Sequence, residues 1–233
     1  MRILAIDTAS SALSAAILDE DEIVAQFGFN IGYQHSQVFM PMVESMLNNA
    51  QLTLRDVSAI AVIVGPGSFT GLRIGIATAK AWGQALGLSL IPIDTLESYI
   101  RLCGAKGLVC PIVEARRDEV YCALFRDGQR IWENKAMTLQ ELINALAVWD
   151  EPITFLGDAL SLYRNLLRYE LGENYLEEPA GKGIFAACGA ALIAKESFLA
   201  GKTVTAAALA PVYILLPEAE KRKLEKEKQK NKI

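Results

Sequence analysis

Histidine is almost absent from this sequence: His35 is the only one among 233 residues. A catalytic zinc ion usually has two or more histidine ligands, and with one histidine no HExxH or HxxxH spacing can exist. A serine–histidine–aspartate triad would need His35 as its base, and nothing in the sequence places it near Ser68. The sequence therefore predicts no metal ligands and no catalytic residues, and we interpret His35 as a hydrogen-bonding residue at a helix start.

Closely spaced cysteines and long apolar runs are also missing. The four cysteines show no CxxC spacing, which indicates reduced cytosolic thiols. No uninterrupted apolar run approaches the roughly 20 residues that a membrane-spanning helix needs. Asp7 interrupts the apolar N-terminus too early for the core of a signal peptide. The sequence predicts a cytoplasmic protein with no membrane association.

Charge is unevenly distributed along the chain, whose net charge is −4. The tail 218–233 holds seven Lys/Arg and four Glu, which leaves 16 basic and 23 acidic residues in 1–217. Because phosphate contacts need clustered cations, the acidic body is a poor nucleic-acid binder on its own. The tail fits a solvated charged helix, and contact with RNA stays open as the alternative.

The same order of predicted strands and helices occurs twice along the chain. Three strands are expected in 2–29 and a helix in 35–51, followed by alternating strands and helices. Three more strands are expected in 108–136, and the next helix opens with the capping box of Thr138 and Glu141. The order of elements in the second half therefore repeats that of the first half.

Three meandering strands followed by alternating helices and strands describe a ribonuclease H-like subdomain. Two tandem copies describe the α/β architecture of the actin-like and sugar-kinase (ASKHA) superfamily. We expect an N-terminal subdomain over 1–103 with partner-docking helices and a C-terminal subdomain over 104–200. The segment 201–233 is expected to return toward the first subdomain and to end in the charged tail.

The run from Gly65 to Gly75, GPGSFTGLRIG, places four glycines between a strand candidate and a helix candidate. A loop that feeds a helix start presents unpaired N–H groups, so contact with an anion or partner and a tight packing turn stay equally open. Known phosphate motifs fail here. Gly71 is followed by Leu72 where a P-loop has Lys, and Thr70 stands where the dinucleotide fingerprint has its third glycine.

An actin-like ATPase needs an Asp-x-Gly loop in the first hairpin of each half. The first hairpin here reads Asp7-Thr-Ala-Ser10, and the second reads Glu114-Ala-Arg-Arg-Asp118. Neither has the glycine that closes a phosphate loop, so a stand-alone actin-like or kinase-like ATPase is the alternative function and not the preferred one. The candidates for nucleotide or partner contact are Asp7, Thr8, Ser10, His35, Gly67, Ser68, Phe69, Thr70, Gly71 and Arg73.

The helix expected over 35–51 has an apolar arc of about 180°, wider than the usual core stripe. It holds three of the five methionines of the chain, and methionine suits adaptable binding faces. We predict a partner-docking face there, with burial of the helix in a large core as the alternative. The docking candidates are Phe39, Met40, Met42, Val43, Met46 and Leu47.

Five segments together make the sequence recognisable. They are Arg2–Thr8, the His-Ser-Gln…Pro helix of 35–41, Gly65–Gly75, Glu114–Tyr121 and Pro211–Tyr213. In this order, and over nearly the whole chain, they resemble the bacterial TsaB (YeaZ) family. The glycine-rich run is the most specific of the five. The chain departs from the family's pattern at Glu114 and Leu215, where aspartate and arginine are common.

The resemblance implies a non-catalytic scaffold or activator subunit in the synthesis of N6-threonylcarbamoyladenosine at position 37 of tRNA. The family's partner is TsaD, a paralogue with metal-binding histidines that transfers the threonylcarbamoyl group, and a TsaE-like ATPase joins the complex. Contact with tRNA is indirect, through the complex. Pairing with TsaD, or with itself as a homodimer when alone, uses helices of the first half. The resemblance implies no cofactor for the chain itself and leaves room for ATP or ADP with Mg²⁺ at the complex interface.

Overall fold

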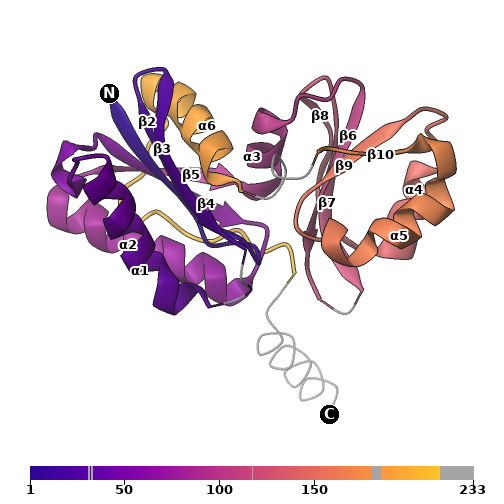
Figure 1. Ribbon diagram of the computed structural model, residues 1–233, viewed down its shortest axis with the longest axis horizontal. Helices are drawn as coiled ribbons and strands as arrows, with labels where there is room; N and C mark the ends of the chain where they lie inside the picture. Colours follow the sequence, from indigo (N-terminus) through magenta and orange to yellow (C-terminus); the bar gives the residue numbers. More distant parts are fainter. Residues whose placement is uncertain (31, 33, 117, 180–184, 216–233) are drawn as a thin grey trace, which may run out of the picture.

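The computed structural model describes residues 1–30, 32, 34–116, 118–179 and 185–215, which form two lobes side by side (Figure 1). The first lobe contains a five-stranded sheet of β1 (Arg2–Asp7), β2 (Leu13–Asp19), β3 (Glu22–Phe29), β4 (Ala59–Gly65) and β5 (Ser89–Asp94). Its order is β3-β2-β1-β4-β5. β1 pairs antiparallel with β2 and parallel with β4. All residues of β4 are buried because helices cover both faces of this sheet.

The second lobe repeats this topology. Its strands are β6 (Leu108–Glu114), β7 (Glu119–Arg126), β8 (Gln129–Thr138), β9 (Ile153–Leu156) and β10 (Tyr175–Glu177). Their order is β10-β9-β6-β7-β8, so three meandering strands again lie beside two parallel ones. The pattern read twice in the sequence is therefore confirmed, although the three-residue strand β10 was not expected.

Helices fill the spaces around the two sheets. They are α1 (His35–Asn49), α2 (Phe69–Leu86), α3 (Thr95–Leu102), α4 (Leu139–Leu146), α5 (Leu160–Leu171) and α6 (Ala187–Leu199), with short 3₁₀ turns η1 (Leu54–Asp56) and η2 (Gly172–Asn174). Figure 1 shows α1 and α2 on one side of the first sheet, α6 on its other side, and α3 between the lobes. α4 and α5 cover the outer face of the second sheet. None of these helices is long and apolar enough to cross a membrane, within the part of the chain described.

The helix α6 packs with the first lobe, although its residue numbers fall in the subdomain expected over 104–200. It lies on β1, β2, β4 and β5 and against α3. Close approach is possible because the helix is rich in small residues: a Cβ on Gly189 would lie 1.9 Å from the Ser98 carbonyl oxygen. The boundary at residue 200 therefore does not follow the packing, since the covering layer of the first sheet comes from the chain's second half.

The last described segment also lies on the first lobe. Val204 forms a β-bridge with Leu90 of β5. The Val212 N–H donates to the carbonyl oxygen of Val64 at the end of β4, at 2.8 Å. Residues 201–215 thus return to the first lobe, and the charged tail from 218 lies outside the described residues.

Two hydrophobic cores meet at β6. Side chains alternate between the two faces of a strand, so Val109 and Val113 point to one side and Leu108 and Ile112 to the other. The first pair belongs to a large core that includes both faces of the first sheet, and the second pair packs with α4 and α5. The first core therefore continues across the boundary between the lobes.

Candidate functional site

The glycine-rich run forms the turn between β4 and α2 and packs on the loop that follows β1. A Cβ on Gly67 would lie 2.3 Å from the Ala9 carbonyl oxygen, and one on Gly71 would lie 1.9 Å from that of Thr8. A Cβ on Gly75 would lie 2.5 Å from Thr8 Oγ1. Only glycine allows such an approach of backbone to backbone. Of the two readings of the run, the structure therefore supports the tight packing turn.

Hydrogen bonds hold this turn against the same loop. The Ser68 N–H donates to the Ala9 carbonyl at 2.6 Å, and the Thr8 hydroxyl donates to the Gly71 carbonyl at 2.7 Å. Ser68 also caps α2, because its hydroxyl accepts the Gly71 N–H at 3.2 Å. Four predicted contact residues, Thr8, Gly67, Ser68 and Gly71, thus have clear structural roles.

Phe69 and Arg73 lie together on the first turns of α2. The Arg73 guanidinium stands 3.8 Å from the centre of the Phe69 ring, a cation–π contact. Arg73 Nε donates to the Tyr213 hydroxyl at 3.1 Å, and the Tyr213 ring lies 4.9 Å from that of Phe69. Tyr213, which belongs to one of the recognised sequence segments, thus joins this small cluster. Thr70 is exposed beside it.

Asp7, at the end of β1, is fully buried. Its Oδ1 accepts the Ala9 N–H at 2.9 Å, whereas Oδ2 makes no hydrogen bond. Burial raises the pKa of this carboxyl to about 7, with a smaller contribution from the negative charge of Asp158, against the lowering effect of the Ala9 and Ala186 amides. Among the described residues, no group of three metal-ligating His, Cys, Asp or Glu side chains occurs.

His35 begins α1 and is buried against the loop after β1. Its Nε2 lies 2.6 Å from the Ser10 carbonyl, which can only accept, so Nε2 carries the proton. The Ser10 hydroxyl in turn donates to the Ala12 carbonyl at 3.0 Å. This arrangement confirms the interpretation of His35 as a hydrogen-bonding residue at a helix start, and it accounts for Ser10 in the same way.

Asp158, on the turn between β9 and α5, joins the two lobes. Its Oδ2 accepts the N–H of Ser11 at 3.0 Å and the hydroxyl of Ser11 at 3.2 Å. Its Oδ1 accepts the N–H of Glu114, at the end of β6, at 3.0 Å. Burial raises the pKa of Asp158, and these donors act in the opposite direction. Sequence reasoning missed this contact; the only signal was the Gly-Asp pair that follows a strand.

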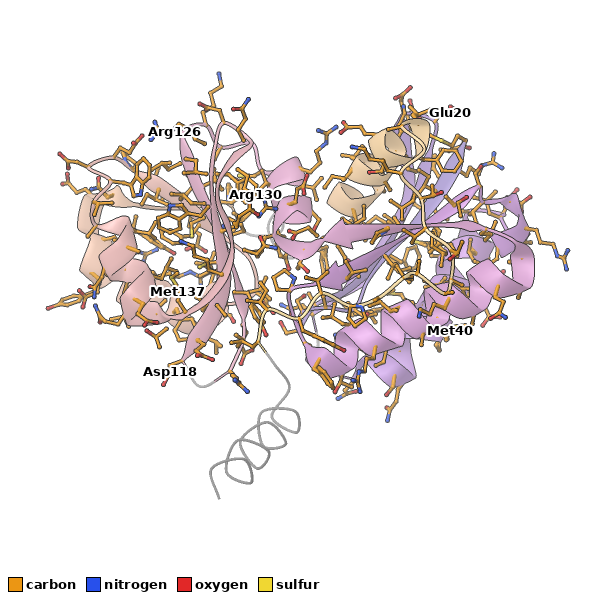
Figure 2. The ribbon with its side chains drawn as sticks, turned by 180° about the vertical axis from the view of Figure 1, so that it is seen from behind. Glu20, Met40, Asp118, Arg126, Arg130 and Met137 are labelled. Carbon is orange, nitrogen blue, oxygen red and sulfur yellow. The ribbon has the colours of Figure 1, made fainter. Side chains whose placement is uncertain are left out.

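The predicted docking face on α1 is wrong for five of its six residues. Because α1 packs on β2 and β3, the apolar arc faces the core, and of the six candidates only Met40 is well exposed, at 48%. Figure 2 labels Met40 on the side of the first lobe that α1 and α2 cover. The buried residues are Phe39, Met42, Val43, Met46 and Leu47.

A groove lies between α1, α2 and η1 on this side of the lobe, with a volume of about 510 Å³. Apolar side chains from all three elements line it, together with two charged side chains. Its apolar lining includes Met40, Leu47, Leu52, Trp82 and Leu86, and the charged residues are Glu44 and Arg55. The accessible apolar surface near α1 is thus this groove and not the helix face itself.

Known proteins resemble the chain in both sequence and structure. A sequence family described as "TsaD: tRNA N6-adenosine threonylcarbamoyltransferase" matches residues 30–220. The tRNA threonylcarbamoyladenosine biosynthesis protein TsaB of Bacillus subtilis (strain 168) is 32% identical over 234 residues, which cover 98% of this chain and 100% of that protein.

Two solved structures show the fold. One, from Pseudomonas aeruginosa, is described as an uncharacterised protein with similarity to the peptidase YeaZ; its TM-score is 0.75 at 25% identity, covering 92% of this chain and 99% of that one. The other is the ROK hexokinase of Thermus thermophilus, with a TM-score of 0.50 at 10% identity, covering 84% and 100%. The two repeated sheets thus have the actin-like ASKHA architecture that the sequence predicted.

Proposed function

Because the chain belongs to the TsaB family of tRNA threonylcarbamoyladenosine biosynthesis proteins, we propose that it acts in this modification as a non-catalytic scaffold. It docks onto a TsaD-like transferase and activates it. The partner performs the chemistry, and this chain supplies a two-lobed body with a docking surface.

The groove between α1 and α2 carries the proposal. Its apolar lining, which includes the half-exposed Met40 and Trp82, is surface that a partner helix with apolar side chains at helical spacing would cover. Glu44 and Arg55, which also line the groove, offer one charge of each sign, which would orient such a helix. Methionine adapts its shape to a partner more easily than branched side chains do.

The junction of the lobes supports the non-catalytic role. Beside it, within the first lobe, Thr8 and Ser68 hold the glycine turn against the β1 loop, and across the junction Asp158 accepts hydrogen bonds from Ser11. Ser68 caps a helix and the Asp158 carboxylate accepts hydrogen bonds from three donors, so both side chains have structural roles. Neither is arranged as a nucleophile with its base.

The remaining members of the complex follow from the family. We propose that a TsaE-like ATPase joins the pair, that tRNA is contacted through the complex, and that the chain pairs with itself through the same groove when TsaD is absent. The chain itself needs no cofactor, and ATP or ADP with Mg²⁺ binds at the complex interface. The site of action is the cytoplasm.

Co-purification with the TsaD-like paralogue tests the docking surface. We expect Met40→Glu to reduce recovery of the partner about tenfold or more, because it places a charge in the covered groove. Leu162→Glu on α5 of the second lobe is the matched control, since Leu162 is exposed at 57% and lies far from the groove in sequence and on the other lobe. Equal recovery with both variants would contradict the proposed surface.

Depletion of the gene tests the function itself. The threonylcarbamoyladenosine content of total tRNA, measured by mass spectrometry, is expected to fall; an unchanged level would contradict the proposal. Mg²⁺-dependent ATP turnover by the purified chain, abolished by Asp7→Ala, would instead favour the stand-alone ATPase.

A further inference from the structure

The turn after β9 binds the first hairpin of the first lobe through the side chain of Asp158. Three donors converge on its carboxylate: the N–H and hydroxyl of Ser11, and the N–H of Glu114. Ser11 lies in the loop between β1 and β2, and Glu114 ends β6, so the donors come from matching ends of the two repeated sheets.

We propose that the Asp158 carboxylate is the built-in occupant of an oxyanion position between the lobes, and takes the donors that a phosphate oxygen of a ligand would otherwise take. Carboxylate and phosphate oxygens accept the same hydrogen bonds from backbone N–H and hydroxyl groups. Because the occupant belongs to the chain, the lobes are fixed to each other without a ligand. This inference does not depend on the proposed partner.

The backbone of the turn places the carboxylate there. Gly157 has a φ of +109°, and a Cβ on it would lie 2.1 Å from the Ile112 carbonyl oxygen, so the turn is pressed directly against β6. On the other side, the Ser161 hydroxyl donates to the Asp158 carbonyl at 2.8 Å in the first turn of α5. Asp158 is thus held from both sides and is only 8% exposed.

Charge at the junction reinforces this occupancy. Asp7 lies near Asp158, and its pKa is raised to about 7, in part by the negative charge of Asp158. An added phosphate would meet these two carboxylates and would find its donors taken. The pKa of the buried Tyr99 is also raised, first by burial and then by the charges of Asp158 and Asp7. The intact junction therefore excludes an anion.

Amide hydrogen exchange of the full chain tests the occupancy. In Asp158→Ala, the Ser11 and Glu114 amides are expected to exchange about tenfold faster or more, the effect of losing one ordinary hydrogen bond, while β1 and β6 amides elsewhere keep their protection. Asp127→Ala is the matched control: Asp127 accepts the Gly107 N–H at 2.9 Å within the second lobe, so only Gly107 should respond. Wild-type exchange rates at both Ser11 and Glu114 in Asp158→Ala would overturn the proposal.

Two further measurements keep the test decisive. If Asp158→Ala does not fold, Asp158→Asn keeps the shape with one acceptor oxygen, and at least one of the two amides must then exchange faster; protection of both would overturn the proposal. Inorganic phosphate is the probe for the oxyanion position. It should slow exchange at Ser11 and Glu114 in Asp158→Ala and leave the wild type unchanged. No effect on the variant, or an equal effect on both proteins, would overturn the assignment.

Discussion

The two lobes share one strand order, but the equivalent turns after β4 and β9 make different contacts. In the first lobe the turn after β4 packs inward, where Gly71 meets the Thr8 carbonyl and Ser68 binds Ala9. In the second lobe the turn after β9 also meets its own sheet, through Gly157, but its Asp158 reaches across to the first lobe. A repeated topology thus closes one lobe on itself and joins the other to its neighbour.

The two hydrophobic cores also differ in whether they are confined to one lobe. The core of the second lobe lies between its sheet and α4 and α5, within one lobe. The core of the first lobe includes α1, both faces of its sheet, and also β6 and β7 residues such as Val109 and Phe125 of the second lobe. The inner face of the second sheet therefore belongs to the core of the first lobe, whereas the core beneath α4 and α5 is formed by the second lobe alone.

Charges placed in the two cores should show this difference most strongly. Met46 and Leu142 are both fully buried, in the shared core and the second core respectively. Met46→Asp and Leu142→Asp should each cost about 3–5 kcal/mol, because each buries an unpaired carboxylate. Hydrogen exchange should show that Met46→Asp exposes both sheets, whereas Leu142→Asp leaves β1 protected. Loss of β1 protection in both variants would mean that the cores unfold as one unit.

Glycine substitutions at the two matching turns should cause the next largest loss in the free energy of unfolding. Gly71→Ala and Gly157→Ala each force a Cβ into a carbonyl oxygen, at 1.9 and 2.1 Å. We expect losses of about 2–4 kcal/mol in urea unfolding, since backbone must move to relieve the clash. Gly87→Ala is the control: Gly87 has a φ of +69° with nothing within 4 Å of a Cβ, so about 1 kcal/mol is expected. Equal losses of stability in all three variants would contradict the conclusion that close packing requires glycine at the two turns.

Asp7→Asn should change how stability depends on pH. The folded pKa of about 7 lies above the ordinary value of 3.8, so the folded state binds this proton more tightly than the unfolded state. The free energy of unfolding therefore falls as pH rises from about 4 to about 7 and stays low above that range. The variant should be more stable than the wild type by about 1–3 kcal/mol at pH 8 and show no gain at pH 4. An unchanged pH slope between the two proteins would contradict this assignment.

The helix caps of the two lobes should give the smallest difference. Thr138 and Glu141 cap α4 reciprocally, whereas Ser68 caps α2 through one side-chain bond. Thermal unfolding should show a loss of about 1 kcal/mol for Thr138→Ala and about half that for Ser68→Ala. A larger loss for Ser68→Ala would show that its side chain does more for the glycine turn than cap a helix.

Much of the fold could be predicted because the periodicity of apolar residues indicates each helix and strand from neighbouring residues alone. The meanders, the alternation that follows them and the cap at Thr138 were all predicted correctly. The strand β10 was missed because three residues are too few for a periodic signal. The packing of α6 could not be predicted, since an alanine-rich helix fits any closely approaching surface.

The candidate site was predicted only in part. The wide arc of α1 indicated burial of some kind, but periodicity cannot tell whether a core or a partner covers an apolar face, and residues such as Met42 and Met46 proved to be core. The glycine run was recognised, yet its partner, the Thr8 backbone, is more than fifty residues away in sequence. Asp158 was missed for the same reason, because its donors come from distant segments.

The position of α6 has a consequence for the order in which the protein folds during synthesis. The first sheet is complete once β5 has been made, but one of its faces stays uncovered until the ribosome has added residues up to Leu199. By then every strand of the second lobe has been made. The lobe that is translated first is therefore completed last. The face of its sheet that α6 covers stays exposed until nearly the whole chain has been synthesised.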